Sequence, residues 1–146
     1  MNMPRTSVTT PYAALLLRLS LGGMFLAHAS LKAFVFTPAG TAHFFEKVGM
    51  PGWMALPTIL AETIGGLALI LGFGTRVVAL ALTPILLGAI VTVHGANGFF
   101  FTHPGGGWEF PAFWIIALLV QSGLGDGAFA IGSLFTRASP RLAAAE

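Results

Sequence analysis

Long, uninterrupted runs of apolar residues dominate the chain. Four of them stand out, at about residues 12–34, 54–73, 77–97 and 110–125. They do not alternate apolar and polar positions as the strands of a membrane barrel do, and helices satisfy their own backbone in lipid. About 20 helical residues cross an apolar layer of ~30 Å, so the first three runs fit directly, and the fourth fits a thinned bilayer or a helix that continues past Gly125. The pattern predicts an all-α membrane protein, an antiparallel bundle of four transmembrane helices.

The connections between the runs add detail. A glycine-rich turn at residues 72–76 makes the second and third helices antiparallel neighbours. In the loop after the first helix, Thr37 and Pro38 suit the N-cap and N1 positions of a helix, and Gly49 and Pro51 suit its end. We therefore expect a short helix there, lying flat on the membrane surface.

Basic residues indicate the orientation. Cytoplasmic flanks of membrane helices carry an excess of Lys and Arg. One side of the predicted bundle has Arg5, Arg76, Arg137 and Arg141. Both termini are therefore expected in the cytoplasm, with residues 1–136 forming one membrane domain and 137–146 a cytoplasmic tail. The helix borders on the opposite, outward side have Trp53, Trp108 and Trp114, a residue type that favours the membrane interface.

The first apolar run also resembles a signal peptide. Residues 27–29, Ala-His-Ala, match the small-residue pattern of a cleavage site. However, Arg18 interrupts the apolar segment and the run continues through residues 31–36. We expect this segment to stay in the protein as its first helix.

Composition agrees with a membrane location. The 146 residues are 55% hydrophobic and only 8% charged, too few charges to cover a water-soluble globule. The net charge is +2 with scattered basic residues, so no nucleic-acid surface is expected. The chain has no cysteine, which excludes disulfides and thiolate metal sites. The predicted surroundings are the lipid bilayer, together with other membrane proteins or further copies of the chain.

Charge inside the apolar runs is the informative feature. A charged residue at the centre of a membrane helix costs about 2.5–3.5 kcal/mol, so it normally has a partner. Glu62 lies near the middle of the second helix, on the same face as Gly65, Gly66 and Leu69. Small residues let another helix approach, so we expect Glu62 to point into the bundle.

The topology brings further polar residues to the same outward half of the membrane. The candidate ligand-binding or proton-relay residues are Glu62, His94, His28, Lys32, Asn97, Glu109 and Trp108, with His103 close to them. Carboxylates and histidines in such surroundings can bind a polar head group or relay protons. Glu62 could equally form an ion pair that only fixes helix register, and His103 and Glu109 could be ordinary loop residues. A haem between His28 and His94, or a metal ion, is not expected, because no tight ligand motif is present.

Arg18 lies in the opposite half of the membrane. We expect it to face protein and to form a structural clamp with Gln121 and Asp126. Pro84 should kink the third helix and could open a slot between helices. An apolar slot with a polar end would suit an isoprenoid quinone or a lipid.

Five motifs in this order resemble the DoxX family of small four-helix membrane proteins. They are Arg18-Leu19-Ser20-Leu21-Gly22 with Lys32, Ala61-Glu62-Thr63-Ile64-Gly65-Gly66 followed by residues 71–76, residues 94–100 from His94 to Phe100, Gly107-Trp108-Glu109-Phe110, and Gly123-Leu124-Gly125. The resemblance spans about residues 15–132. It implies that Arg18, Glu62, His94, Asn97 and Glu109 are the family's polar positions. It also implies a link to quinone-coupled sulfur oxidation, to membrane oxidoreductase complexes or to accessory roles.

Three functions remain open from the sequence. The first is an accessory inner-membrane subunit, quinone-linked, of an oxidoreductase or a similar complex. The second is a structural or assembly subunit without a ligand. The third is a small transporter or proton relay, which four helices without an inverted repeat favour least. Whether the chain is itself an enzyme, and what its substrate or cofactor is, does not follow from the sequence.

Overall fold

The structure is a computed structural model in which residues 9–132 are described. The expected tail at 137–146 and the basic residues Arg5, Arg137 and Arg141 lie outside these residues. The described part is helical, without strands. Its elements are α1 (Thr10–Ser30), η1 (Leu31–Val35), α2 (Thr37–Lys47), η2 (Gly52–Met54), α3 (Ala55–Leu71), α4 (Thr75–Ala89), η3 (Ile90–His94), η4 (Gly95–Asn97) and α5 (Glu109–Leu124).

Three helical segments are long and apolar enough to cross a membrane. They are Thr10–Val35, Gly52–Leu71 and Thr75–Asn97, with 26, 20 and 23 residues. The fourth predicted helix exists as α5, but its 16 residues span only about 24 Å at 1.5 Å per residue. It ends at Leu124 because Gly125 leaves the helix with a φ of 82°. The all-helical membrane class is confirmed, whereas four complete membrane crossings stay a prediction.

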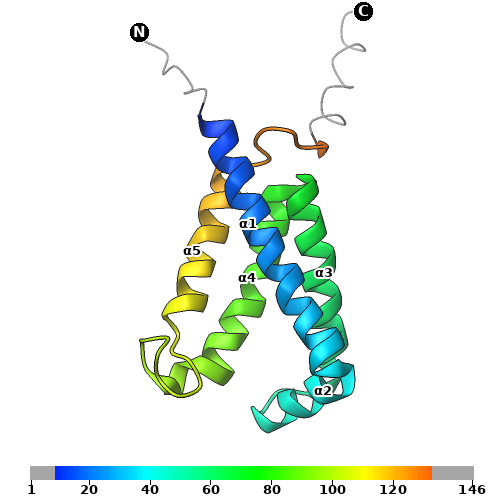
Figure 1. Cartoon of the computed structure of the whole chain (residues 1–146), viewed down its shortest axis with the longest axis vertical. Helices are drawn as coiled ribbons and strands as arrows, with labels where there is room; N and C mark the ends of the chain where they lie inside the picture. The colour runs from blue at the N-terminus through cyan, green and yellow to red at the C-terminus, as the bar shows by residue number, and fades with distance from the viewer. Residues whose placement is uncertain (1–8, 133–146) are drawn as a thin grey trace, which may run out of the picture.

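The four long helices run along the length of the molecule (Figure 1). α1 packs against α3 and α5, and α4 packs against α5 and α3. Both ends of the described chain lie at one end of the molecule, whereas α2 and the loop of residues 98–108 lie at the other (Figure 1). We call the latter the α2 end.

Large apolar side chains cover the outside as well as the inside. The core contains Leu21, Phe25, Leu69, Leu118 and Trp114. On the outside, each long helix exposes at least one large apolar side chain by more than 60%, namely Leu16, Ile64, Val77 and Phe113. An apolar exterior of this extent around an apolar core suits lipid as the surrounding solvent.

Glycines let α1 and α3 approach closely. A Cβ placed on Gly22 would lie 2.6 Å from the Gly66 carbonyl oxygen and 3.2 Å from the Ile70 backbone nitrogen. A Cβ on Gly66 would lie 2.9 Å from the Gly22 carbonyl oxygen. These contacts involve backbone atoms, which cannot rotate away. The small residues on the Glu62 face therefore serve the close helix contact that their type suggested.

We expect Gly22→Ala to lower the free energy of unfolding by about 1–3 kcal/mol, because the new methyl group forces α1 away from α3. Gly23→Ala is the matched control, since no atom lies within 4 Å of a Cβ at that position. There the higher helix propensity of alanine should stabilise the protein by up to about 1 kcal/mol. Unfolding of both variants by SDS in mixed micelles measures the difference, and equal stabilities would contradict the close-packing account.

The expected short helix in the first long loop is α2. It begins at Thr37, whose hydroxyl oxygen accepts a hydrogen bond from the Gly40 N–H at 3.2 Å. After it, Gly49 adopts a φ of 83°, a conformation that glycine reaches easily. Phe45 faces the protein, whereas Phe44 is exposed. The helix and its glycine stop are thus present, and its position on the membrane surface stays a prediction.

Two of the membrane helices change to π-helix near the α2 end. α1 continues as η1, which carries Lys32, and α4 continues as η3, which ends at His94. A π-helical turn shifts the direction of side chains relative to a regular α-helix and is frequent at functional sites. The α-helical periodicity of the sequence did not predict these segments.

Candidate functional site

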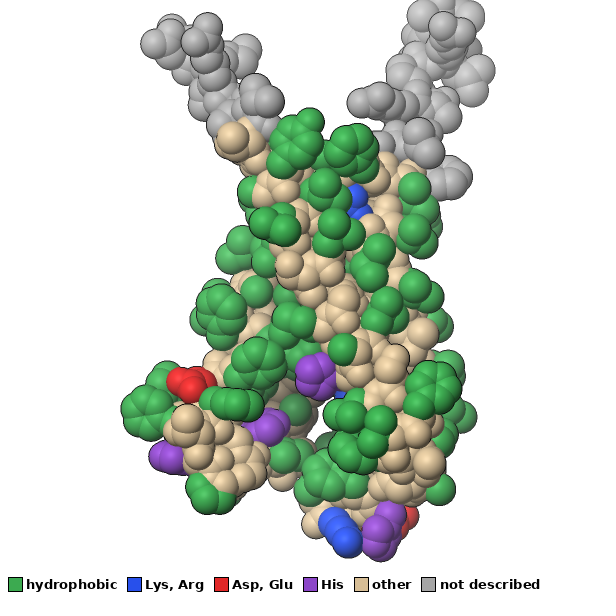
Figure 2. All heavy atoms as spheres, viewed as in Figure 1, with side chains coloured by type: hydrophobic (Ala, Val, Ile, Leu, Met, Phe, Trp, Pro, Cys, Tyr) green, Lys and Arg blue, Asp and Glu red, His purple; other side chains and the backbone are tan. Residues whose placement is uncertain are grey.

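A cavity of about 610 Å³ lies between the helices at the α2 end. Its walls come from α1 and η1, α2, α3, α4 and η3, and α5. Figure 2 shows an opening between the lobe that contains α2 and the lobe that contains the 98–108 loop. The walls are mainly apolar and include Phe44, Phe45, Phe110 and Pro84. The slot expected beside Pro84 therefore exists.

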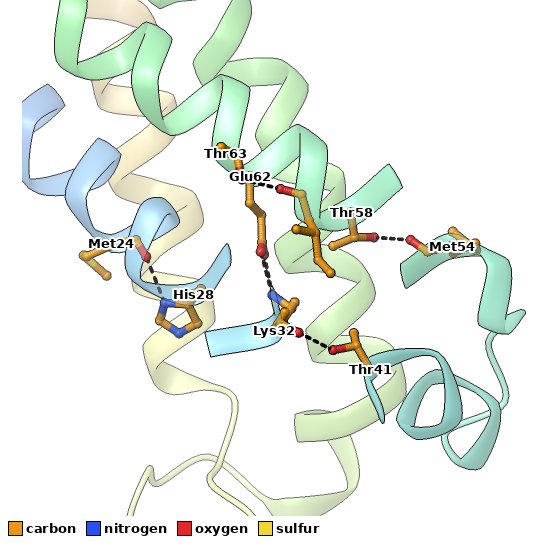
Figure 3. Close-up of polar contacts among 9 residues, drawn as sticks. Met24, His28, Lys32, Thr41, Met54, Thr58, Glu62 and Thr63 are labelled. Atoms are coloured by element: carbon orange, nitrogen blue, oxygen red, sulfur yellow. Dashed lines mark hydrogen bonds and ion pairs between the residues drawn. The ribbon is translucent and has the colours of Figure 1, made fainter. Parts of the chain in front are cut away.

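The polar centre of the cavity is an ion pair between η1 and α3 (Figure 3). The Lys32 Nζ atom lies 2.6 Å from Glu62 Oε1 and 2.8 Å from Oε2. Glu62 is almost fully buried at 3% exposure, whereas 20% of the Lys32 side chain is exposed. Glu62 thus points into the protein, where Lys32 compensates the charge that lipid would not tolerate.

The backbone of Lys32 is also fixed. Its carbonyl oxygen accepts a hydrogen bond of 3.0 Å from the Thr41 hydroxyl of α2. The π-helical turn leaves carbonyls without their usual i+4 donor, so a side chain can take that place. Thr41 thereby links α2 to the ion pair, a role for which the sequence contains no specific signal.

His28 lies one helical turn before Lys32 and also lines the cavity. Its Nδ1 atom is 2.9 Å from the Met24 carbonyl oxygen. Because a carbonyl can only accept, Nδ1 carries the hydrogen and donates it. Its ring contacts Trp114 edge to face, with the ring centroids 5.0 Å apart. In Figure 3 the second ring nitrogen lies on the side of the imidazole away from the Met24 bond.

Trp114 corrects one expectation from the sequence. Its indole was expected at the membrane interface, but it is 3% exposed and packs within the core. Trp114 and Phe110 both line the cavity, and their ring centroids are 5.8 Å apart. A tryptophan one turn inside the predicted border of a helix can face either the membrane interface or the core. The hydrophobic pattern of the sequence does not distinguish these two positions.

His94 approaches the cavity from η3. Its Nδ1 atom donates to the Gly106 carbonyl oxygen at 2.9 Å. Asn97 donates to the same carbonyl at 3.2 Å and to the Val93 carbonyl at 3.0 Å. His94 and Asn97 therefore hold the glycine-rich part of the 98–108 loop against η3, and only His94 of the two lines the cavity.

The remaining candidates organise the loop. Glu109 Oε1 accepts the Phe101 N–H at 2.6 Å. His103 Nδ1 donates to the Asn97 carbonyl at 2.7 Å. The Trp108 ring packs edge to face on Phe99, with a centroid distance of 4.8 Å. Within the described chain, these side chains lie outside the cavity walls. The structure thus gathers His28, Lys32, Glu62 and His94 at one cavity and leaves the loop group beside it.

Arg18 lies in the first half of α1, away from the cavity, and is 1% exposed. Its guanidinium donates to three backbone carbonyls, those of Leu69 at 3.1 Å, Ala128 at 2.7 Å and Ile70. Of the side chains expected as its partners, Asp126 interacts with Arg18 electrostatically, but the hydrogen bonds of Asp126 and Gln121 go to other residues. Gln121 donates to the Gly125 carbonyl at 2.8 Å, and Asp126 accepts the Thr75 N–H at 3.1 Å. All three residues hold the same end of the bundle together through the backbone.

No group of three or more histidine, aspartate or glutamate side chains in residues 9–132 is close enough to hold a metal ion. What the site offers chemically is a neutral ion pair and two histidines at the edge of an apolar cavity. This arrangement can bind the polar head of an amphipathic molecule, with the apolar part against the aromatic walls.

Comparisons with known proteins agree with the sequence resemblance. The family model described as DoxX matches residues 13–95. The chain is 38% identical over 79 residues to the Bacillus subtilis (strain 168) protein named "Putative oxidoreductase CatD", which covers 54% of this chain and 58% of that protein. It is 50% identical over 42 residues to "Inner membrane protein YqjF" of Escherichia coli (strain K12), covering 29% and 32% of the two chains.

The matches to these relatives thus extend over less than two thirds of either one's length. No solved structure matches the chain. The family match covers more than half of the 146 residues and includes all of α2 and α3, most of α1 and nearly all of the helical segment that ends at Asn97. It contains His28, Lys32, Glu62 and His94, the candidate residues that line the cavity. The chain therefore belongs to the DoxX family and is a membrane protein.

Proposed function

We propose that the chain is an accessory subunit of a quinone-linked oxidoreductase in the bacterial inner membrane. Four helices cross the bilayer in antiparallel order with both termini in the cytoplasm, and the α2 end faces outward. The cavity there holds the head group of an isoprenoid quinone or a related amphipathic molecule, and the rest of the surface contacts lipid and the partner subunit.

This proposal rests on the cavity at the α2 end. Its volume of about 610 Å³ falls in the range of small-molecule sites, and its walls combine aromatic side chains with a few polar groups. A purely structural ion pair would need no such space beside it. The oxidoreductase context is supported by the name of the Bacillus subtilis relative, and the membrane by that of the Escherichia coli relative.

A cavity-filling substitution tests the proposal. Gly88 lines the cavity and has no atom within 4 Å of a Cβ position, so Gly88→Phe adds a ring at the cavity wall without a backbone clash. We expect the variant to retain less than about a tenth of the quinone that co-purifies with the wild-type protein in mild detergent. Extraction and chromatography of the bound lipid, normalised to protein, measures this.

Gly23→Phe is the matched control, because Gly23 also has open space around it but lies on α1 outside the cavity walls. It should retain wild-type quinone. Equal quinone in all three proteins, or none in the wild type, would contradict the proposed ligand.

A structural or assembly subunit is the second candidate. It is favoured by the ion pair itself, since both carboxylate oxygens of Glu62 are satisfied by Lys32 without a ligand. If Gly88→Phe preserves assembly with the partner complex and its full activity, this second function replaces the first.

A further inference from the structure

The hydrogen-bonding groups around the cavity are unequally divided between donors and acceptors. The neutral imidazole has one N–H and one lone pair on nitrogen. In both His28 and His94, Nδ1 donates its hydrogen to a backbone carbonyl. In a neutral ring the remaining nitrogen, Nε2, can then only accept. Both histidines line the cavity, and a neutral ring of each has acceptor capacity left but no free donor.

The threonines of the cavity have the same bias. The Thr58 hydroxyl donates to the Met54 carbonyl at 2.8 Å, and the Thr92 hydroxyl donates to the Gly88 carbonyl at 2.9 Å. With its hydrogen used in this way, each oxygen retains only acceptor capacity. Because they donate to the helix backbone, the hydroxyls of these two cavity-lining threonines can only accept from a ligand.

Lys32 is the cavity's cationic donor. Of its three N–H bonds, two are directed at Glu62 Oε1 and Oε2, so one remains for a ligand. The charges of Lys32 and Glu62 cancel each other. The site therefore has no net positive charge with which to attract a phosphate or carboxylate head group.

From this inventory we infer that the cavity selects a neutral head group bearing hydroxyls, of the hydroquinone or substituted phenol class, over the corresponding quinone. A hydroxyl donates to a histidine Nε2 and still accepts from Lys32, whereas a quinone carbonyl can use only the lysine. This inference rests on the proposed function and specifies the form of the ligand: the reduced, hydroxyl-bearing ring is bound more tightly than the oxidised one.

Binding of three matched ligands to the wild-type protein in lipid nanodiscs tests the inference. They are a decyl-substituted hydroquinone, the quinone obtained from it by oxidation, and the dimethyl ether of the hydroquinone. The ether preserves the ring and tail but has no O–H donor. A reductant can hold the hydroquinone reduced without altering the chain, which has no cysteine. Isothermal titration calorimetry gives the three dissociation constants.

We expect the hydroquinone to bind about tenfold more tightly than both the quinone and the ether. A factor of this size corresponds to the loss of one hydrogen bond that leaves a buried acceptor of the protein unsatisfied. His28→Phe should reduce this preference to threefold or less. The control His43→Ala should preserve it, because His43 lies outside the cavity. Thermal unfolding of each variant verifies that it is folded.

The outcomes separate the two proposals. If the quinone or the ether binds as tightly as the hydroquinone, the inferred selectivity is overturned and the ligand cavity stands. If none of the three binds, both the cavity's function and its selectivity are overturned.

Discussion

Replacing Arg18 by methionine should lower the free energy of unfolding by about 3 kcal/mol or more. The guanidinium is fully enclosed and donates to the carbonyls of Leu69, Ile70 and Ala128. Leu69 and Ile70 belong to the last turn of α3, where a cation is favourable. The Leu69 carbonyl also accepts the Gly72 N–H at 3.1 Å, so the guanidinium adds a second bond to this carbonyl. Hydrogen bonds to a charged group contribute about 1.5–3 kcal/mol each, and methionine replaces none of them.

Reversible unfolding by SDS in mixed micelles, followed by circular dichroism, measures this loss. Arg76→Met is the matched control, because Arg76 is an exposed arginine with one hydrogen bond, from Nη1 to the Ser122 carbonyl at 3.1 Å. It should change stability by less than about 1 kcal/mol. Similar losses in the two variants would show that Arg18 is not the link between α1, α3 and residue 128.

The elements of the fold follow closely from the hydrophobic pattern. Membrane helices can be predicted from the sequence because nearly every position that faces lipid has an apolar side chain. Each long apolar run therefore corresponds to one helix. The predicted first helix, 12–34, corresponds to Thr10–Val35 in the structure, and the predicted third, 77–97, to Thr75–Asn97. The sequence did not predict the π-helical turns inside these segments, because such turns change the backbone register without changing the composition.

The site was partly predictable for a similar reason. A carboxylate in an apolar run must have a partner, and Lys32 was among the few residues on the same side that could supply one. The hydrogen-bond partners of Arg18 were not predictable, because backbone carbonyls have no signature in the sequence. The donor and acceptor roles of His28 and His94 also needed the structure, since they depend on which carbonyl each Nδ1 atom faces.

The second large effect is expected for Lys32→Met, which leaves Glu62 buried at 3% exposure without its cation. Breaking a buried pair by removing one partner typically costs about 3–5 kcal/mol, because the charge that remains is uncompensated. The same SDS titration measures the loss. Lys47→Met is the control, since Lys47 is an exposed lysine at the end of α2, and its removal should change stability by about 0.5 kcal/mol or less.

The double variant Lys32→Met with Glu62→Leu separates structure from function. Replacing a whole buried pair by apolar residues of similar size is often neutral or stabilising, so the double variant should recover to within about 1 kcal/mol of the wild type. The cavity of the double variant would then have the two histidines but no ion pair. We expect less quinone to co-purify with it than with the wild type, although its stability is restored. A double variant that is stable and still binds quinone would instead limit Lys32 and Glu62 to fixing η1 against α3, and would show that the apolar walls of the cavity hold the ligand without the lysine donor.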